Sequence, residues 1–299
     1  MKIAFLGTGL MGEPLAARLL GRAYDVAVYN RSLDKTQALR EHGATVHDTP
    51  AGAVAAGGWT ITMLADAAAI RETILTPQVL PLLQGRRVLN MGTISPAQAR
   101  DVGERVAQAG GQFMECPVLG SIPEARHGTL ILMFGGTARQ FKEALPMLQT
   151  FGPMPLHIGE VGQASTVKLA MNQLIASLTT AFSMSLALVR TEGVDVDKFM
   201  SIARESALYA PTYDKKLPRL LERHFDQPNF PLKHLLKDVD LFRQSARTHG
   251  VNTDVLASLE TLLKSAVGHG LADSDYAAVY DRIHPPVTDG SPPEPSGPD

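Results

Sequence analysis

The first half of the chain alternates short apolar runs with amphipathic segments. KIAFLG (2–7), YDVAVYN (24–30) and WTITMLA (59–65) are apolar runs of strand length, and RRVLNMGT and QFMECPV continue the series. Between them, segments such as EPLAARLLGR (13–22) have apolar residues at the three- and four-residue spacing of a helix. Strands that alternate with helices pair in parallel through right-handed crossovers. The pattern therefore predicts an α/β fold with a doubly wound parallel sheet.

After Gly162 the pattern changes to helical periods alone, up to about Ile283. Gly193, Gly250 and Gly270 stand where left-handed glycines commonly end helices. We therefore expect an α/β domain at 1–162 and an all-helical domain at 163–286. The remainder, 287–299, is rich in Pro, Gly and Ser and is predicted to be a disordered tail.

The beginning of the helical half carries a polar pair on an apolar face. In GQASTVKLAMNQL (162–174), Lys168 and Asn172 are four residues apart and so lie above one another on a helix. At about 100° per residue, Ile175 and Phe182 fall on the same side. A buried ammonium group is costly unless something pairs with it. This face therefore either meets solvent at its first turn or opens into a site.

A membrane span is the alternative explanation of this stretch. Residues 169–189 contain no charge and approach the ~20 residues that cross a bilayer. Several Asn, Gln, Ser and Thr residues interrupt them, and the sequence has no second long hydrophobic segment. We expect a buried helix packed between domains or subunits, and no membrane partner.

Composition narrows the classes of partner. The 299 residues carry a formal net charge of -2, and the isoelectric point is about 6.5. Neither value indicates binding to nucleic acid or to anionic lipid. The single cysteine, Cys116, has no partner for an internal disulfide, and the N-terminus lacks the pattern of a leader peptide. We expect a cytoplasmic protein.

A glycine-rich loop follows the first expected strand. Gly7, Gly9 and Gly12 form G-x-G-x-x-G between a strand and a helix, which is the dinucleotide-binding context of a Rossmann domain. The first glycine permits the tight turn, the second lets the backbone approach a pyrophosphate, and the third lets helix and strand pack closely. Leu10 and Met11 belong to the same expected cofactor site.

The end of the second expected strand selects between NAD and NADP. An acid at this position binds the ribose hydroxyl of NAD, whereas an arginine accommodates the 2′-phosphate of NADP. The chain has Asn30, Arg31 and Ser32 here, with Lys35 one turn later. These side chains predict NADP (NADPH) as cofactor. The alternative is that the segment is only a solvated loop and helix cap.

Five motifs, in this order, resemble the β-hydroxyacid dehydrogenase family, which includes 3-hydroxyisobutyrate dehydrogenases and glyoxylate/succinic semialdehyde reductases. They are GLMGEPLA, GTISPAQAR from Gly92, ECPVLGSIPEARHGTL from Glu115, GQASTVKLAMNQL and LKD at 236–238. The resemblance implies that Lys168 is the catalytic acid/base and that Asn172 supports it. It also implies that Thr93 lies beside the nicotinamide and that Lys237 reaches cofactor or substrate.

The same resemblance implies an NADP(H)-dependent oxidoreductase that interconverts a small hydroxy acid and its aldehyde or keto acid. Met63 and Leu64 are expected in the cofactor site, and Asp238 is expected, with Thr93 and Lys168, to contact a small carboxylate-bearing substrate. A homodimer or homotetramer is implied. An imine reductase and a catalytically inert NADP-binding scaffold are the alternatives.

The chain departs from the family pattern in its substrate loop. The family commonly has P-V-S-G-G where this chain has PVLGS, so Leu119 and Ser121 replace a serine and a glycine around Gly120. Leu119 has no side-chain donor. Ser121 lies two residues on, so its hydroxyl is a candidate replacement. Alternatively, Ser121 caps the turn and backbone groups of Gly120 bind the substrate. In the helix motif, Met171 replaces an asparagine.

No metal site is expected. His127, His157, His224 and His234 have no spacing typical of metal ligands. Cys116, on an expected strand, is predicted to be a small buried side chain rather than a nucleophile. The segment DKKLPRLLERHF (214–225) is interpreted as a solvated charged face.

Overall fold

The computed structural model describes residues 1–286. The chain forms two compact units, of which the first is Met1–Met171 and the second begins at Asn172. Both contribute to one continuous helix, α8 (Gln163–Thr191). The domain boundary expected after residue 162 stays a prediction, and the expected tail at 287–299 lies outside the described residues.

The first unit is built on a sheet whose described strands number nine, in the order β3-β2-β1-β4-β5-β6-β8-β7 with β9 beside β8. These strands are β1 (Lys2–Leu6), β2 (Asp25–Tyr29), β3 (Thr45–Val46), β4 (Trp59–Thr62), β5 (Arg87–Asn90), β6 (Gln112–Glu115), β7 (Val118–Leu119), β8 (Ile131–Gly135) and β9 (Leu156–Gly159). From β3 to β6 every pair is parallel, which confirms the doubly wound fold. At the other edge, β8 is antiparallel to β6 and β7, because the short segment after β7 turns the chain back instead of crossing over.

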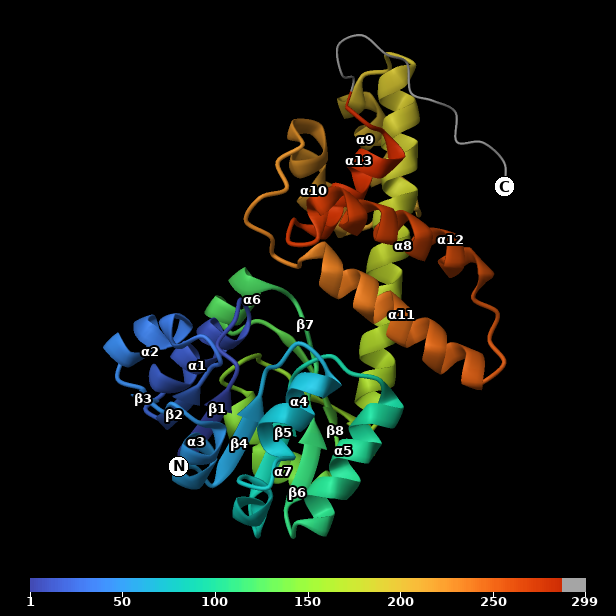
Figure 1. Cartoon of the computed structure of the whole chain (residues 1–299). Coiled ribbons are helices and arrows are strands. Elements are labelled where there is room, and N and C mark those ends of the chain that lie inside the picture. Colours follow the sequence, from blue (N-terminus) through green and yellow to red (C-terminus); the bar gives the residue numbers. More distant parts are fainter. Residues whose placement is uncertain (287–299) are drawn as a thin grey trace. The chain divides into compact units, whose positions relative to one another are not determined.

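Helices cover both faces of this sheet (Figure 1). Alternate residues of a strand point to opposite faces, so in β1 Ile3 and Phe5 join one apolar cluster while Ala4 and Leu6 join the other. The helices of the unit, besides the start of α8, are α1 (Gly12–Leu20), η1 (Leu33–Thr36), α2 (Gln37–Glu41), α3 (Pro50–Ala56), α4 (Ala67–Ile74), η2 (Leu80–Leu83), α5 (Pro96–Gln108), α6 (Ile122–His127) and α7 (Ala138–Leu148).

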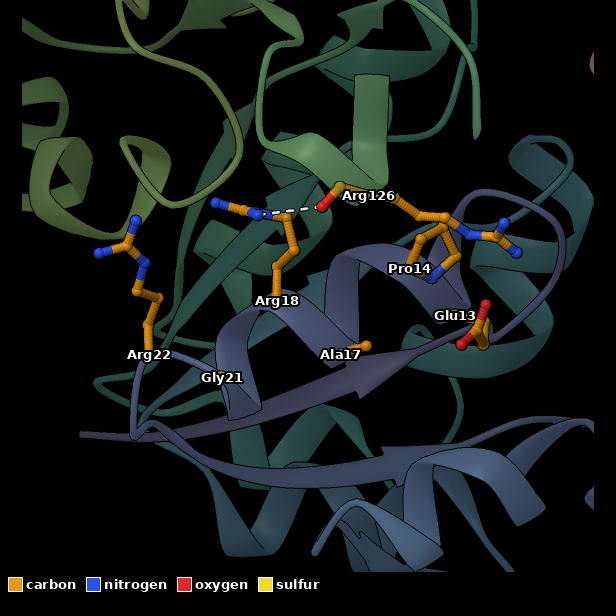
Figure 2. A pocket seen from close by; sticks show the side chains of 7 residues that line it. All are labelled: Glu13, Pro14, Ala17, Arg18, Gly21, Arg22 and Arg126. Carbon is orange, nitrogen blue, oxygen red and sulfur yellow. Dashed lines mark hydrogen bonds between the residues drawn. The ribbon is translucent and has the colours of Figure 1, made fainter. Parts of the chain in front are cut away.

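Arg18 of α1 forms hydrogen bonds to the ends of two other helices. Its Nε donates to the carbonyl oxygen of Thr150, just after α7, at 2.7 Å. Its Nη1 donates to the carbonyl oxygen of Arg126, in the last turn of α6, at 3.0 Å (Figure 2). Carbonyl groups at a helix end lack intrahelical partners, and a cation suits the negative end of the helix dipole. Arg18 also lines a pocket of about 390 Å³ that contains none of the site residues expected from the sequence.

The regular elements in the described part of the second unit are helices, as expected, and one isolated antiparallel bridge joins Pro231 to Asp275. After α8 it contains α9 (Val196–Glu205), α10 (Pro211–Glu222), α11 (Leu232–Thr248), α12 (Asp254–Ala266), η3 (Val267–Leu271), η4 (Tyr276–Val279) and α13 (Tyr280–Ile283). Gly193, Gly250 and Gly270 have φ values of +71°, +71° and +84°. Gly193 and Gly250 follow the ends of α8 and α11, as predicted, whereas Gly270 lies at a non-helical position inside η3.

The segment 214–225 corrects one expectation. It forms most of α10, but Lys216 is only 4% exposed rather than part of a solvated face. Its Nζ donates to Asp275 at 2.6 Å and lies 4.0 Å from the ring centre of Tyr276. Burial lowers the pKa of Lys216, and the Asp275 carboxylate opposes this. A buried ammonium group is tolerated here because a buried carboxylate pairs with it.

Helix α8 is long and apolar enough, by length and composition, to cross a bilayer, and 39% of its most apolar window is buried. Central helices of globular proteins meet the same criterion. The absence of a membrane partner stays a prediction.

Candidate active site

The last residues of five parallel strands stand in one row. In the pairing register, neighbours across β2, β1, β4, β5 and β6 are Tyr29, Leu6, Thr62, Asn90 and Glu115. Expected site residues follow each of them, directly in a loop after β1, β2, β4 and β5, and in and after β7 beyond β6. Ligands of such sheets bind beyond the carboxyl ends of the strands. The first unit therefore collects these loops along the edge where a ligand is expected.

The three glycines of the first loop have different surroundings. An added Cβ at Gly7, whose φ is +99°, would lie 2.4 Å from the carbonyl oxygen of Met63 and 2.9 Å from Cδ2 of Leu64. A Cβ at Gly12 would lie 1.9 Å from the carbonyl oxygen of Gly7. At Gly9 an added Cβ would meet no described atom within 4 Å. The fold itself requires Gly7 and Gly12, whereas the open space at Gly9 fits the close approach of a dinucleotide pyrophosphate.

The loop passes directly into α1. Met11 packs against the apolar cluster on one face of the sheet, and Leu10 is 50% exposed. The N–H of Glu13 already donates to the carbonyl oxygen of Gly9 at 3.0 Å. The N–H groups ahead of it at the helix start have no intrahelical acceptors, and the positive end of the helix dipole attracts anions. The loop and helix together suit a phosphate group.

Asn30 connects the glycine loop to the loop after β2. Its Oδ1 accepts the backbone N–H of Thr8 at 3.0 Å, and its Nδ2 donates to the carbonyl oxygen of Ser32 at 2.9 Å. Arg31 and Lys35 are exposed beside it. The buried hydroxyl of Thr8 has no hydrogen-bond partner within residues 1–286. The amide of Asn30 thus shapes both loops, and its contact with the cofactor stays a prediction.

The loop after β5 carries Thr93, which is half-buried. Asn90 fixes this loop: its Oδ1 accepts from Oγ1 of Thr62 at 3.0 Å and from the N–H of Gly92 at 3.2 Å. Its Nδ2 donates to the carbonyl oxygen of Gly92 at 2.9 Å. Thr62, Asn90 and Gly92 are all buried, so these bonds satisfy polar atoms that water does not reach. Thr93 is thereby held just beyond the row of strand ends.

The PVLGS loop places Leu119 in β7 and Ser121 directly before α6. The N–H and the hydroxyl of Ser121 both donate to Oε2 of Glu124, at 2.7 and 3.0 Å. Gly120 between them is exposed and has a φ of +128°. The hydroxyl of Ser121 thus has a structural partner at the helix start, as the capping alternative requires. Its contact with substrate stays a prediction.

The first turns of α8 bury one polar face. Ser165, Lys168, Leu169 and Asn172 are at most 8% exposed. Their spacing of three, four and seven residues marks one side of a helix. Lys168 and Asn172 therefore share a buried face, as the sequence indicated.

Glu115 is the buried residue that sequence reasoning left without a role. Its Oε1 accepts the N–H groups of Gly162 and Ser165 at 2.7 and 3.1 Å, and its Oε2 accepts the hydroxyl of Ser165. The carboxylate therefore caps α8 from the end of β6. The available signal was an acid that ends a strand directly after the apolar residues Phe113 and Met114, since a buried charge requires nearby donors.

In the second unit, Asp238 joins Asn172 and Lys237. Nδ2 of Asn172 donates to Oδ2 of Asp238 at 2.6 Å, and Nζ of Lys237 lies 3.1 Å from Oδ1 of Asp238. Asn172 Oδ1 is buried without a hydrogen-bond partner in the described chain. An acceptor in this condition is suited to a donor from a ligand or from a neighbouring ammonium group.

His157 and Cys116 both have structural surroundings. Within residues 1–286, no group of three or more His, Cys, Asp or Glu side chains is placed to hold a metal ion. Nε2 of His157 donates to the carbonyl oxygen of Gly136 at 2.6 Å, and the ring stacks on Phe141. Cys116 is buried as predicted, and burial together with Glu115 raises the pKa of its thiol. A thiol in this condition is a poor nucleophile.

Comparison with known proteins identifies both units. Residues 2–159 match the family model of the NAD binding domain of 6-phosphogluconate dehydrogenase, and residues 162–283 match that of the NAD-binding domain of NADP-dependent 3-hydroxyisobutyrate dehydrogenase. Glyoxylate/succinic semialdehyde reductase 1 of Arabidopsis thaliana is 31% identical over 95% of this chain and 98% of its own length.

Two solved structures have a similar fold. A Mycobacterium tuberculosis 3-hydroxyisobutyrate dehydrogenase, solved with L-serine, has a TM-score of 0.85 and 23% identity, covering 94% of this chain and 98% of its own. An imine reductase of Myxococcus stipitatus with NADP+ has a TM-score of 0.63 and 21% identity, covering 94% and 99%.

The parallel sheet, the glycine loop and the helical second half define a dinucleotide-dependent dehydrogenase with a Rossmann domain. The chain belongs to the β-hydroxyacid dehydrogenase family. It is accordingly an NAD(P)-dependent oxidoreductase of the hydroxyacid and semialdehyde reductase type.

The glycine loop yields a paired prediction. Gly9→Ala is expected to leave the free energy of unfolding within about 0.5 kcal/mol of the native value, because its Cβ enters open space. It should nevertheless weaken cofactor binding, because the methyl group occupies the space for the pyrophosphate. Gly12→Ala should instead destabilise the protein by about 1–3 kcal/mol through overpacking.

Urea unfolding without cofactor measures the first quantity for both variants, and cofactor fluorescence titration measures the second. Native cofactor affinity in Gly9→Ala would contradict this assignment of the loop.

Proposed function

We propose that the protein is an NADPH-linked reductase of small carboxylic acids that bear an aldehyde or ketone group. The main support for this proposal is the buried polar face of α8 in a chain of this family. On this face Lys168 is 8% exposed and Asn172 is 1% exposed. A lysine and an asparagine are costly to bury. Their burial on one helix face, one turn apart, supports a chemical role in a chain of this family.

Lys168 is the proposed general acid. A bound nicotinamide cofactor supplies the hydride that reaches the carbonyl carbon of the substrate. Nζ of Lys168 donates a proton to the carbonyl oxygen, which gains charge as the carbonyl is reduced, and it removes that proton in the reverse direction. General acid/base catalysis works best when the pKa lies near the working pH, and burial lowers the pKa of a lysine.

Asn172 is the proposed partner of this step. Its Nδ2 is committed to Asp238, which fixes the orientation of the amide, and its Oδ1 remains as a buried acceptor. That oxygen is suited to the ammonium group of Lys168 or to a hydroxyl group of the product. Asp238 therefore supports the proposal by orienting the amide.

A preference for NADPH is part of the proposal. Arg31, Ser32 and Lys35 follow β2, and the strand end has no carboxylate to bind a ribose 2′-hydroxyl. A guanidinium group pairs well with a phosphate, and both cations are exposed where they would meet one. An imine reductase similar in fold was solved with NADP+, and a variant of it with NAD+. The preference therefore rests on the residues of this chain.

The substrate class rests on Lys168 and the PVLGS loop. Leu119 would offer apolar surface in the loop that binds substrate in the family, which favours a substrate with a short carbon chain over a bare one. A cytoplasmic homodimer or homotetramer, with no nucleic-acid or membrane partner, completes the proposal.

A substrate screen tests the proposed function. We expect NADPH oxidation with at least one of glyoxylate, succinic semialdehyde, tartronate semialdehyde and methylmalonate semialdehyde, and no turnover of a cyclic imine. The assay follows absorbance of the reduced cofactor. Turnover of the imine alone would favour the imine reductase alternative, and turnover of none would favour an inert NADP-binding protein.

Replacement of the proposed acid is the second test. Lys168→Ala should bind NADPH normally but lose at least about 10²-fold in kcat, the low end for general acid catalysis. Lys198→Ala, an exposed lysine on α9, is the matched control and should retain the native rate. A native kcat for Lys168→Ala on the best substrate of the screen would refute the proposed mechanism.

Cofactor preference gives the third test. Arg31→Ala should reduce the ratio of kcat/KM for NADPH to that for NADH by roughly ten- to hundredfold, since a lost charge-assisted contact costs about 1.5–3 kcal/mol. Arg40→Ala, exposed on α2, should leave the ratio unchanged. Equal ratios in native protein and Arg31→Ala would remove Arg31 from the phosphate site.

A further inference from the structure

We infer that Glu115 is a positioning residue for the reaction, because its buried carboxylate sets the rotation of α8 about its axis and thereby the direction of Lys168. The inference rests on the proposed function of Lys168. Glu115 is 0% exposed at the end of β6, and every contact used here lies within the first unit. The contact joins the end of β6 to the start of α8, which lie far apart in the sequence.

The carboxylate of Glu115 binds hydrogen-bond donors at the start of α8. Both oxygens of Glu115 accept hydrogen bonds from the start of α8, from the N–H of Gly162 and from the N–H and hydroxyl of Ser165. The N–H groups in the first turn of a helix lack intrahelical acceptors, and the helix dipole is positive there. A buried carboxylate satisfies the donors and offsets the partial charge at the same time. The contact is therefore strong and directional.

The contact at Ser165 also fixes the rotation of α8 about its axis. Ser165 is bound through two of its own atoms, its N–H and its hydroxyl, so the helix cannot turn about its axis without breaking the contact. At about 100° per residue, Lys168 lies about 60° from Ser165 around the helix and Asn172 about 20°. The bound residue and the two proposed catalytic residues thus share one face of α8. Fixing Ser165 fixes the direction in which the other two side chains leave the helix.

The fold leaves little room around the carboxylate of Glu115. Gly135 of β8 pairs with Glu115, and an added Cβ there would lie 2.6 Å from Oε1. Gly162, at the start of α8, has a φ of +99°, a left-handed conformation that favours glycine. The residues around Glu115 thus leave its carboxylate and the helix start little freedom to move.

The decisive experiment removes the hydroxyl contact and keeps the carboxylate. Ser165→Ala is expected to lower kcat by about ten- to hundredfold, because small misplacements of a catalytic group have effects of this order. The Kd for NADPH should stay native, because Ser165 is not in the glycine loop. Ser165→Thr, which keeps a hydroxyl, should restore most of the activity. This rescue and the split between kcat and cofactor binding distinguish positioning from a general loss of structure.

Thr166→Ala is the matched control. Its hydroxyl also bonds at the start of α8, to the carbonyl oxygen of Gly162 at 2.8 Å, but Thr166 is exposed, and Glu115 accepts its bonds from Gly162 and Ser165. It should retain native kcat. Gly135→Ala is a second perturbation, which displaces the carboxylate without changing Glu115 and should lower kcat in the same way as Ser165→Ala.

Melting temperatures of all variants identify losses that follow unfolding. Native kcat in both Ser165→Ala and Gly135→Ala, with Lys168→Ala inactive, would overturn the inference alone. A loss of activity that simply follows loss of folded protein would also overturn it. A native rate in Lys168→Ala would overturn the proposed function and this inference together.

Discussion

The structure depends on buried polar side chains that end neighbouring parallel strands and must find partners inside the protein. Thr62, Asn90 and Glu115 are each 0% exposed and stand side by side in the register of β4, β5 and β6. A buried polar group without a hydrogen bond is costly. Their partners include the backbone of the following loop and the start of α8. The hydrogen bonds that satisfy these strand ends therefore also fix the segments that carry Thr93 and Lys168.

The glycine loop separates what the fold needs from what a ligand needs. Gly7 and Gly12 are in close contact with backbone atoms of the protein, so they are required whether or not a cofactor binds. Gly9 has open space around it, and the protein alone gives no reason for a glycine there. A backbone that approaches a pyrophosphate gives that reason. The same motif thus contains two positions that the fold requires and one, Gly9, that is proposed to serve the cofactor.

Two buried lysines illustrate how context decides the role of a residue. Lys216 meets the buried carboxylate of Asp275, beside the ring of Tyr276, and this pairing accounts for its burial in the core of the second unit. Lys168 lies instead on the buried face of α8 whose start is capped by Glu115, one turn before Asn172, whose amide is oriented by Asp238. Only the second environment combines orientation with an available acceptor, which is why the proposed chemistry is assigned there.

The sequence by itself determined the features that local pattern encodes. Apolar period and glycine position defined the alternating strands and helices, the loop at Gly7 to Gly12, the helix ends and the shared face of Lys168 and Asn172, because each depends on residues a few positions apart. Tertiary structure decided the rest. The antiparallel edge strands, the pairing of Lys216 with Asp275 and the capping of α8 by Glu115 join residues far apart in the chain, 59 positions in the second case and 50 at Ser165 in the third. Such contacts follow from how strands and helices pack, which no local period records.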